Sequence, residues 1–270
     1  MLPLNRHHHH ALTSAMTYSL NHLLKTKPVW CSVRVQSKSY LEIGVKIVTD
    51  SGFELFNLKV LTGRSGSTHV METDKSRLPV CCPDRHINPG GTFCISYDST
   101  KSITSDNDAE IWWDALYRYL KNQLLVDQVR KWPVTEGLSH GDAAVKTQRQ
   151  IEVLLSNRPS LLSEALRGMF RRTGWLGATL PKFSRKGQLY KAPRVCPRRR
   201  CSTCREAELD RLTSGIKPNL CPDLRLVRQT TFLEILRRRQ EKAFMQSVRK
   251  KNKCCGTLKQ CSLRDFESWY

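Results

Sequence analysis

Apolar and polar residues alternate in three neighbouring stretches near the start of the chain, residues 29–36, 40–49 and 53–63. Regular alternation and many β-branched side chains are typical of strands with one buried face. Only short turns separate the stretches, such as the one at residues 50–52. These short connections predict an antiparallel β-meander, since parallel strands need longer crossovers.

Apolar residues recur with the period of a helix before and after this meander. The clearest helical stretch, residues 108–132, ends at Pro133 and carries four large side chains on one face: Trp112, Leu116, Tyr119 and Gln123. The other helical stretches are residues 14–26, residues 142–157 with Asp142 as the expected N-cap, residues 158–175 and residues 229–253. The order of elements predicts an α+β fold in which helices flank the meander.

Charge and cysteine usage divide the chain into two regions. Residues 1–150 hold 18 Lys and Arg against 14 Asp and Glu, a net of +4, whereas residues 181–270 hold 23 against 8, a net of +15. We therefore expect two domains, with the boundary in the polar, Gly- and Pro-containing stretch 180–195. The expected parts are a tag-like or disordered N-terminus (1–14), a first domain (15–156), a connecting helix and linker (157–195) and a smaller basic, cysteine-rich, mainly helical or irregular domain (196–270).

The sequence also carries expectations about where the protein works. No apolar run approaches the roughly 18 residues that span a bilayer, and no signal-peptide pattern opens the sequence. We therefore expect a cytoplasmic protein with no membrane partner. In that setting the 11 cysteines would serve as metal ligands or as a nucleophile rather than as a disulfide scaffold.

The densest candidate chemistry lies in CCPDRHINPGGTFCISY, residues 81–97. A cysteine that receives an acyl group needs a thiolate fraction, access for a bulky partner, and a donor aimed at the oxyanion of the intermediate. The glycines of this stretch leave the backbone near Cys94 open. The neutral amide of Asn88 can donate to the oxyanion, and His86 can brace the loop through hydrogen bonds to the backbone.

Two other interpretations of this stretch stay open. Cysteines are often buried as small hydrophobic residues, so Cys94 can simply pack in the core. Cys81 and Cys82 end a strand-like segment, where one is expected to face the core and the other solvent. Metal binding by Cys81, Cys82, His86 and Cys94 is the third option, although adjacent cysteines on a strand chelate one ion poorly. We favour the acyl-carrier interpretation of Cys94.

The combination of a β-meander, a His-x-Asn pair, a Gly-containing turn, a cysteine and a Trp-bearing helix resembles the ubiquitin-conjugating enzyme family (UBC-like fold). That family has a His-Pro-Asn motif, a short loop and then the cysteine that carries ubiquitin as a thioester. HINPGGTFCI departs from the eukaryotic pattern because Ile87 replaces the proline and the gap from asparagine to cysteine is shorter. These departures are similar to the prokaryotic branch, some of whose members carry a cysteine-rich extension. The resemblance covers residues 15–156.

The resemblance implies a function and partners. Cys94 would accept a ubiquitin-like protein as a thioester from a ThiF-like activating enzyme and would pass it to a target. Asn88 would supply the oxyanion-side amide and His86 would brace the loop. The resemblance also implies an association with bacterial antiviral defence.

The family has a flexible segment after the cysteine that places a polar or acidic group near the attacking lysine. The nearest equivalent here is WPVTEGLSHGDAA, residues 132–144, whose Gly137 and Gly141 allow movement. His140 is our candidate general base, because its ordinary pKa lies near neutrality. A histidine in a loop is also commonly a cap or a surface residue, so this alternative stays open.

The last third of the chain suggests a metal. CPRRRCSTC contains a Cys-x4-Cys-x2-Cys pattern, and its final pair has the spacing that wraps one tetrahedral zinc ion. A structural metal would stabilise a basic domain with few large apolar residues. We predict a structural Zn2+ bound by four of seven cysteines, with free thiols as the alternative: Cys196, Cys201, Cys204, Cys221, Cys254, Cys255 and Cys261.

The helical stretch 229–253 supplies much of the basic charge, and we place Phe232, Leu236, Ala243 and Val248 on its apolar side. The charged residues are Arg237, Arg238, Arg239, Lys250 and Lys251. A solvated basic face is the simplest interpretation. Contact with nucleic acid, or with an acidic protein such as the activating enzyme, is the functional one. The alternative function is therefore a basic, zinc-stabilised nucleic-acid- or partner-binding protein with a non-catalytic front domain.

Overall fold

The computed structural model describes residues 18–63, 67–74, 77–95, 102–133, 137–177, 180, 182–183, 189–190 and 223–264. The chain divides into two compact units, one made of residues 1–133 with 245–270 and the other of residues 134–244. This division differs from the boundary that composition suggested at 180–195. The reason is that the segment after the last helix forms hydrogen bonds with Asp84 and Arg130 in the front of the chain.

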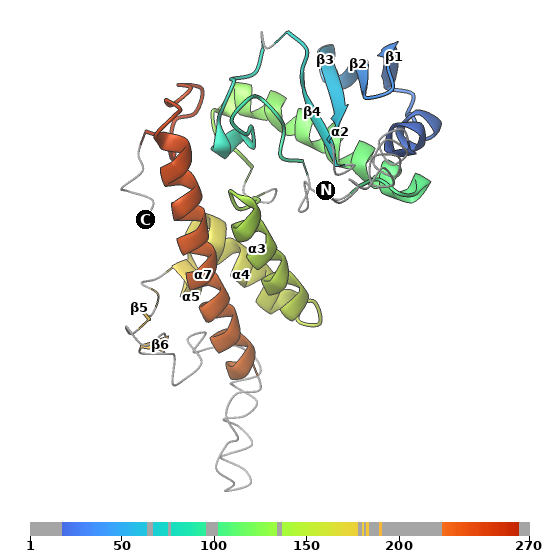
Figure 1. The fold of residues 1–270 in the computed structure, drawn as a ribbon. Coiled ribbons are helices and arrows are strands. Elements are labelled where there is room, and N and C mark those ends of the chain that lie inside the picture. The colour runs from blue at the N-terminus through green and yellow to red at the C-terminus, as the bar shows by residue number, and fades with distance from the viewer. Residues whose placement is uncertain are drawn as a thin grey trace, which may run out of the picture. The chain divides into compact units, whose positions relative to one another are not determined.

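The first unit is built on a four-stranded antiparallel sheet, drawn in blue to teal in Figure 1. Its strands are β1 (Cys31–Gln36), β2 (Tyr40–Thr49), β3 (Gly52–Thr62) and β4 (Thr68–Glu72), and they pair in chain order. The expected meander is therefore confirmed. Alternate residues of β2 and β3 turn to one face, where they are buried: Leu41, Ile43, Val45, Ile47, Phe56, Leu58 and Val60.

Helix α2 (Asp106–Val129) contributes the other half of this core, together with a short helix over residues 18–25. Ser105 caps its first turn, because the Ser105 Oγ accepts a hydrogen bond from the Asp108 N–H at 3.1 Å. The predicted inner face is confirmed, since Trp112, Leu116, Tyr119 and Gln123 are all buried. The predicted end at Pro133 is wrong. The helix ends at Val129 because Arg130 adopts a left-handed conformation (φ 56°) that terminates it.

The second unit is mainly helical. It contains α3 (Asp142–Leu154), α4 (Pro159–Arg171), the short α5 (Gly174–Gly177), a two-stranded pair β5 (Lys182–Phe183) and β6 (Leu189–Tyr190), and most of α7 (Leu224–Arg249). Its core joins the four helices named here: Ile151, Leu155, Leu161, Ala165, Met169, Leu176 and Val227. Among the helices that the structure describes, none is long and apolar enough to cross a membrane.

Two predicted details of these helices are wrong. Gly141, and not Asp142, is the N-cap of α3, while Asp142 lies in the first turn, where its charge complements the helix dipole. On α7, Phe232 and Ala243 are exposed, although the sequence placed them on the apolar side. The buried positions of α7 include charged residues such as Glu234, which shifts the inner face away from the one that apolar residues alone predict.

The two glycines expected to permit movement between residues 132 and 144 instead allow close packing. A Cβ added to Gly137 would lie 2.7 Å from the ring of Phe170, and one added to Gly141 would lie 2.7 Å from the ring of Phe244. Gly141 also has a φ of 85° and a ψ of 141°, a region that other residues rarely adopt. The glycines therefore fix this segment against aromatic rings of the same unit.

Replacing Gly141 with alanine tests this packing, with Gly174→Ala as the matched control. Both glycines have a positive φ, but only the Cβ at Gly141 would meet other atoms. We expect Gly174→Ala to lower the free energy of unfolding by about 1 kcal/mol through backbone strain alone. Gly141→Ala should lose about 1–3 kcal/mol more, because the ring of Phe244 must shift. Equal losses in urea unfolding would contradict the packing role.

Candidate active site

The loop between β4 and α2 begins with a tight, hydrogen-bonded turn. Cys82 and Ile87 exchange two backbone hydrogen bonds, each 3.0 Å long, around the 3-10 turn Pro83–Arg85. His86 closes this turn in the left-handed conformation (φ 55°), and its N–H donates to the carbonyl of Pro83 at 2.7 Å. The turn therefore fixes the path of the backbone directly before Asn88.

A second turn leads from Asn88 to Cys94. The Gly91 N–H donates to the Asn88 carbonyl at 3.0 Å, and the Asn88 N–H donates to the Thr92 carbonyl at 2.8 Å. Gly90 and Gly91 have φ values of 93° and 91°, which explains why glycine stands at both positions. The turn brings the chain back to the sheet, where the Phe93 N–H donates to a carbonyl of β4 at 2.8 Å.

Cys94 follows this turn, and its N–H donates to the carbonyl of His86 at 2.8 Å. Its side chain is half-buried, whereas Cys31, Cys81 and Cys82 are 3%, 7% and 0% exposed. Cys94 is thus the most exposed of the four cysteines of the front region. The expectation that Cys81 or Cys82 faces solvent is wrong, because both lie in the folded loop rather than on a strand.

A buried arginine attaches the loop to α2. Arg85 is 1% exposed, and its guanidinium donates to the side-chain oxygen of Gln123 at 2.7 Å and to the carboxylate of Asp127 at 2.7 Å. The Gln123 amide donates in return to the Arg85 carbonyl at 2.7 Å. Two residues of α2, Gln123 and Asp127, therefore provide hydrogen-bond partners for the Arg85 guanidinium and the Arg85 carbonyl. The sequence feature that could have indicated this contact is Gln123, a polar residue on the otherwise apolar face of α2.

Aromatic side chains of α2 and the following segment hold the other side of the loop. The Tyr119 hydroxyl donates to the carbonyls of Arg85 and His86 at 3.2 and 3.4 Å, and its ring stacks on Phe93 with centroids 4.8 Å apart. Burial raises the pKa of Tyr119 well above its ordinary value, so the hydroxyl stays a donor. The His86 ring packs edge-to-face on Trp132 at 4.8 Å.

The predicted site residues are brought together in part. His86, Asn88 and Cys94 lie in one hydrogen-bonded loop, and the Asn88 amide is 3.5 Å from the hydroxyl of Thr92, at the outer limit for a hydrogen bond. His140 belongs to the other compact unit. There it is half-buried, and its N–H donates to the carboxylate of Glu241 at 2.9 Å. The roles of these residues stay predictions.

The basic charge of α7 is partly neutralised within the second unit. Arg237 is buried and donates to Glu234 in a two-point contact of 2.6 and 2.9 Å and to Glu241 at 2.8 Å. Although burial alone would raise the pKa of Glu241, the charge of Arg237 lowers it overall. Arg238 binds Glu234 at 2.7 Å. Two of the three consecutive arginines therefore serve the fold, which leaves fewer charges for nucleic acid than the sequence suggested.

The predicted metal ligands divide into two groups. Cys196, Cys201, Cys204 and Cys221 lie outside the described residues. Cys254, Cys255 and Cys261 are described, and they lie beside Cys82 of the loop rather than in a separate domain. Sequence reasoning placed these two sets of thiols in different domains and missed their convergence.

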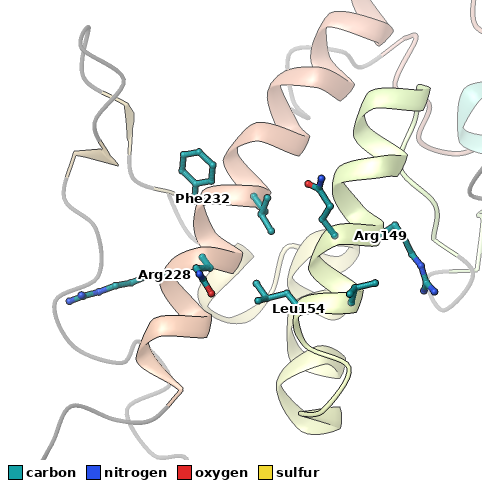
Figure 2. Close-up of a pocket in the computed structure, with 8 residues that line it drawn as sticks. Arg149, Leu154, Arg228 and Phe232 are labelled. Atoms are coloured by element: carbon teal, nitrogen blue, oxygen red, sulfur yellow. The ribbon is translucent and has the colours of Figure 1, made fainter.

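The second unit also contains an open groove of about 730 Å3 between α3 and α7, shown in Figure 2. Its walls are mostly apolar, with Leu154 on α3 and Phe232 on α7. Arg149 and Arg228 stand at its margins and point away from the centre. No cysteine lines this groove, so it does not add to the chemistry of the Cys94 loop.

Comparison with protein families agrees with the fold and the loop. Residues 30–134 match the family described as Prokaryotic E2 domain, a range that contains the sheet, the Cys94 loop and α2. This part of the chain therefore belongs to a prokaryotic ubiquitin-conjugating-like E2 family. Such domains in general work with a ubiquitin-like protein and an activating enzyme. Searches of curated proteins and of solved structures gave no match.

Replacing Arg85 with methionine tests the support of the loop. We expect Arg85→Met to lower the free energy of unfolding by about 2 kcal/mol, because charge-assisted hydrogen bonds are lost while Asp127 stays partly solvated. The control Arg118→Met, an exposed arginine of α2, should change it by less than about 0.5 kcal/mol. Urea unfolding followed by tryptophan fluorescence measures both. Equal changes in the free energy of unfolding would contradict the proposed support of the loop by Arg85.

Alkylation of the native protein tests which front cysteine is accessible. Burial raises the pKa of the Cys31 and Cys81 thiols to about 11, so at pH 8 only about one thiol in a thousand is ionised. We expect iodoacetamide to modify Cys94 well before Cys31 and Cys81, as peptide mass spectrometry would show. In urea, which unfolds the protein and exposes all three thiols, the alkylation rates of Cys94, Cys31 and Cys81 should become similar. Native rates that are already equal would contradict the burial pattern.

Proposed function

We propose that this chain is a ubiquitin-like protein conjugating transferase in which Cys94 carries the modifier as a thioester. The Cys94 thiolate attacks the thioester carbonyl that links the modifier to a ThiF-like activating enzyme. A new carbon–sulfur bond forms at Cys94, the old one breaks, and the cysteine of the activating enzyme leaves as a thiolate. A target lysine amine then attacks the carbonyl and releases Cys94.

The observation that carries this proposal is the position of Cys94. It is the half-buried cysteine of a loop whose backbone is hydrogen bonded from Cys82 to Cys94, inside the segment that matches the E2 family. A fixed backbone lowers the entropy lost when a large acyl partner binds. The buried thiols of Cys31, Cys81 and Cys82 lack this access.

Asn88 and His86 have proposed supporting roles. Asn88 lies in the same turn as Cys94, and its neutral amide forms a long contact of 3.5 Å with the Thr92 hydroxyl, which it can exchange for a hydrogen bond to an oxyanion at little cost. His86 braces the loop through its carbonyl, which accepts the Cys94 N–H. His140 is the proposed general base for the incoming amine, and bacterial antiviral defence is the proposed setting.

The thioester is tested in the native host with its own activating enzyme and modifier. The host expresses the wild-type chain, Cys94→Ser or Cys94→Ala, and lysates are quenched in acid and run on non-reducing gels. The wild type should show a larger band that thiol reductant removes. Cys94→Ser should give a reductant-resistant ester, and Cys94→Ala should give no band. Cys31→Ala, which removes a buried thiol of β1, should behave as the wild type.

The same assay separates the role of Asn88 from that of Cys94. Asn88→Ala should still form the band but should discharge it to free lysine about 100-fold more slowly, because an oxyanion donor acts in the second step. A reductant-sensitive band of equal strength in Cys94→Ala would end the proposal.

A further inference from the structure

Beyond the proposed transfer reaction, the first unit contains a cluster of thiols away from Cys94. The Cys82 thiol lies within hydrogen-bonding reach of the thiols of Cys255 and Cys261, and both Cys82 and Cys261 are fully buried. Cys261 in turn lies within reach of Cys255 and Cys254. Four sulfur atoms therefore converge from two segments that lie far apart in the sequence, and all four cysteines belong to the same compact unit.

Two clamps hold the segment that carries three of these thiols against the loop. The Arg130 guanidinium donates to the carbonyls of Gly256 and Thr257 at 2.7 and 3.3 Å. Further along, the N–H and hydroxyl of Ser262 donate to the carboxylate of Asp84 at 2.7 and 2.6 Å. Asp84 lies two residues after Cys82, so the second clamp acts directly beside the cluster. Figure 1 shows the segment after α7, in red, beside the loop.

The backbone around the cluster suits thiolate ligands. The Gly256 N–H donates to the sulfur of Cys254 at 3.4 Å, the kind of contact that stabilises charge on a ligating sulfur. Gly256 has a φ of 74°, in the left-handed region that favours glycine. The hydroxyl of Thr257 lies 3.0 Å from the sulfur of Cys255.

We propose that Cys82, Cys254, Cys255 and Cys261 bind one structural zinc ion, which fastens the C-terminal segment to the base of the Cys94 loop. Four thiolates in a tetrahedron are the preferred ligands of structural zinc. Cys81 is the less suitable fourth ligand. Its neighbour Cys82 has extended backbone (φ −156°, ψ 94°), so the two side chains point to opposite sides.

Within the described residues, no group of three His, Cys, Asp or Glu side chains already stands in the arrangement that a bound ion requires. The thiols lie within hydrogen-bonding reach of one another instead. A zinc ion would replace the thiol hydrogens with Zn–S bonds of about 2.3 Å, which set the sulfur atoms about 3.8 Å apart. Thiols within hydrogen-bonding reach of one another are already close to that separation.

The site deepens the earlier prediction of zinc at the C-terminal cysteines by naming a ligand from the E2 domain itself. Cys82 exchanges backbone hydrogen bonds with Ile87, and the carbonyl of His86, the residue before it, accepts the Cys94 N–H. Metal binding would therefore stabilise the first turn of the loop without touching the reactive thiol. The proposal does not depend on whether Cys94 forms a thioester.

Zinc content of the full-length chain tests the proposal. Because the tract His7–His10 can hold metal loosely, the reduced protein is first dialysed against a mild chelator, and zinc is then measured by mass spectrometry. We expect Cys82→Ser and Cys261→Ser each to lose about one zinc ion per chain relative to the wild type. Cys94→Ser and Cys31→Ala should keep it, since neither thiol belongs to the cluster.

Further variants separate ligand loss from misfolding and from a second site. Cys261→His should retain metal, because imidazole can replace one thiolate, whereas a variant that only fails to fold would lose it. Binding of Co2+ should give the visible bands of a tetrahedral cobalt–thiolate centre, which Cys82→Ser removes. The double variant Cys201→Ser/Cys204→Ser should leave these bands unchanged. Unaltered zinc in both Cys82→Ser and Cys261→Ser, or disulfides without metal in the wild type, would overturn the proposal.

Discussion

The buried guanidinium of Arg85 is the interaction on which the loop depends. A charge at 1% exposure is tolerated only when its hydrogen bonds are satisfied, and here Gln123 and Asp127 satisfy them. Because the same Gln123 also binds the Arg85 carbonyl, one side chain of α2 fixes both the charge and the backbone of the turn. The positions of His86, Asn88 and Cys94 all follow from this attachment.

The buried part of the loop and its solvent-exposed part are formed by different residues. The residues that contact α2 are buried, whereas Pro89 and Gly90 are exposed and Asn88 and Cys94 are half-buried. An acyl carrier benefits from this order, since the thiol must meet large partners while its backbone stays in place. The loop lies within residues 30–134, the range that matches a prokaryotic E2 domain.

Local patterns in the sequence predicted the meander and the inner face of α2 correctly, because alternation and helical period are properties of neighbouring residues. The pair formed by Arg85 and Gln123 was not predictable in this way, since it joins residues 38 positions apart. The end of α2 was misjudged because Arg130 adopts a left-handed conformation that no apolar pattern reveals. On α7, Arg237 looked like surface charge, but Glu234 and Glu241 at helical spacing draw it inward.

The return of the C-terminal segment to the first unit has a consequence for how the protein is made. Arg130 and Asp84 leave the ribosome before the whole of the second unit, while Thr257 and Ser262, which they bind, follow it. Domains fold as their residues emerge, so the sheet and α2 can assemble early. The base of the Cys94 loop then lacks these contacts until residues 256–262 have emerged, so the final form of the loop is reached only after the whole second unit has been synthesised.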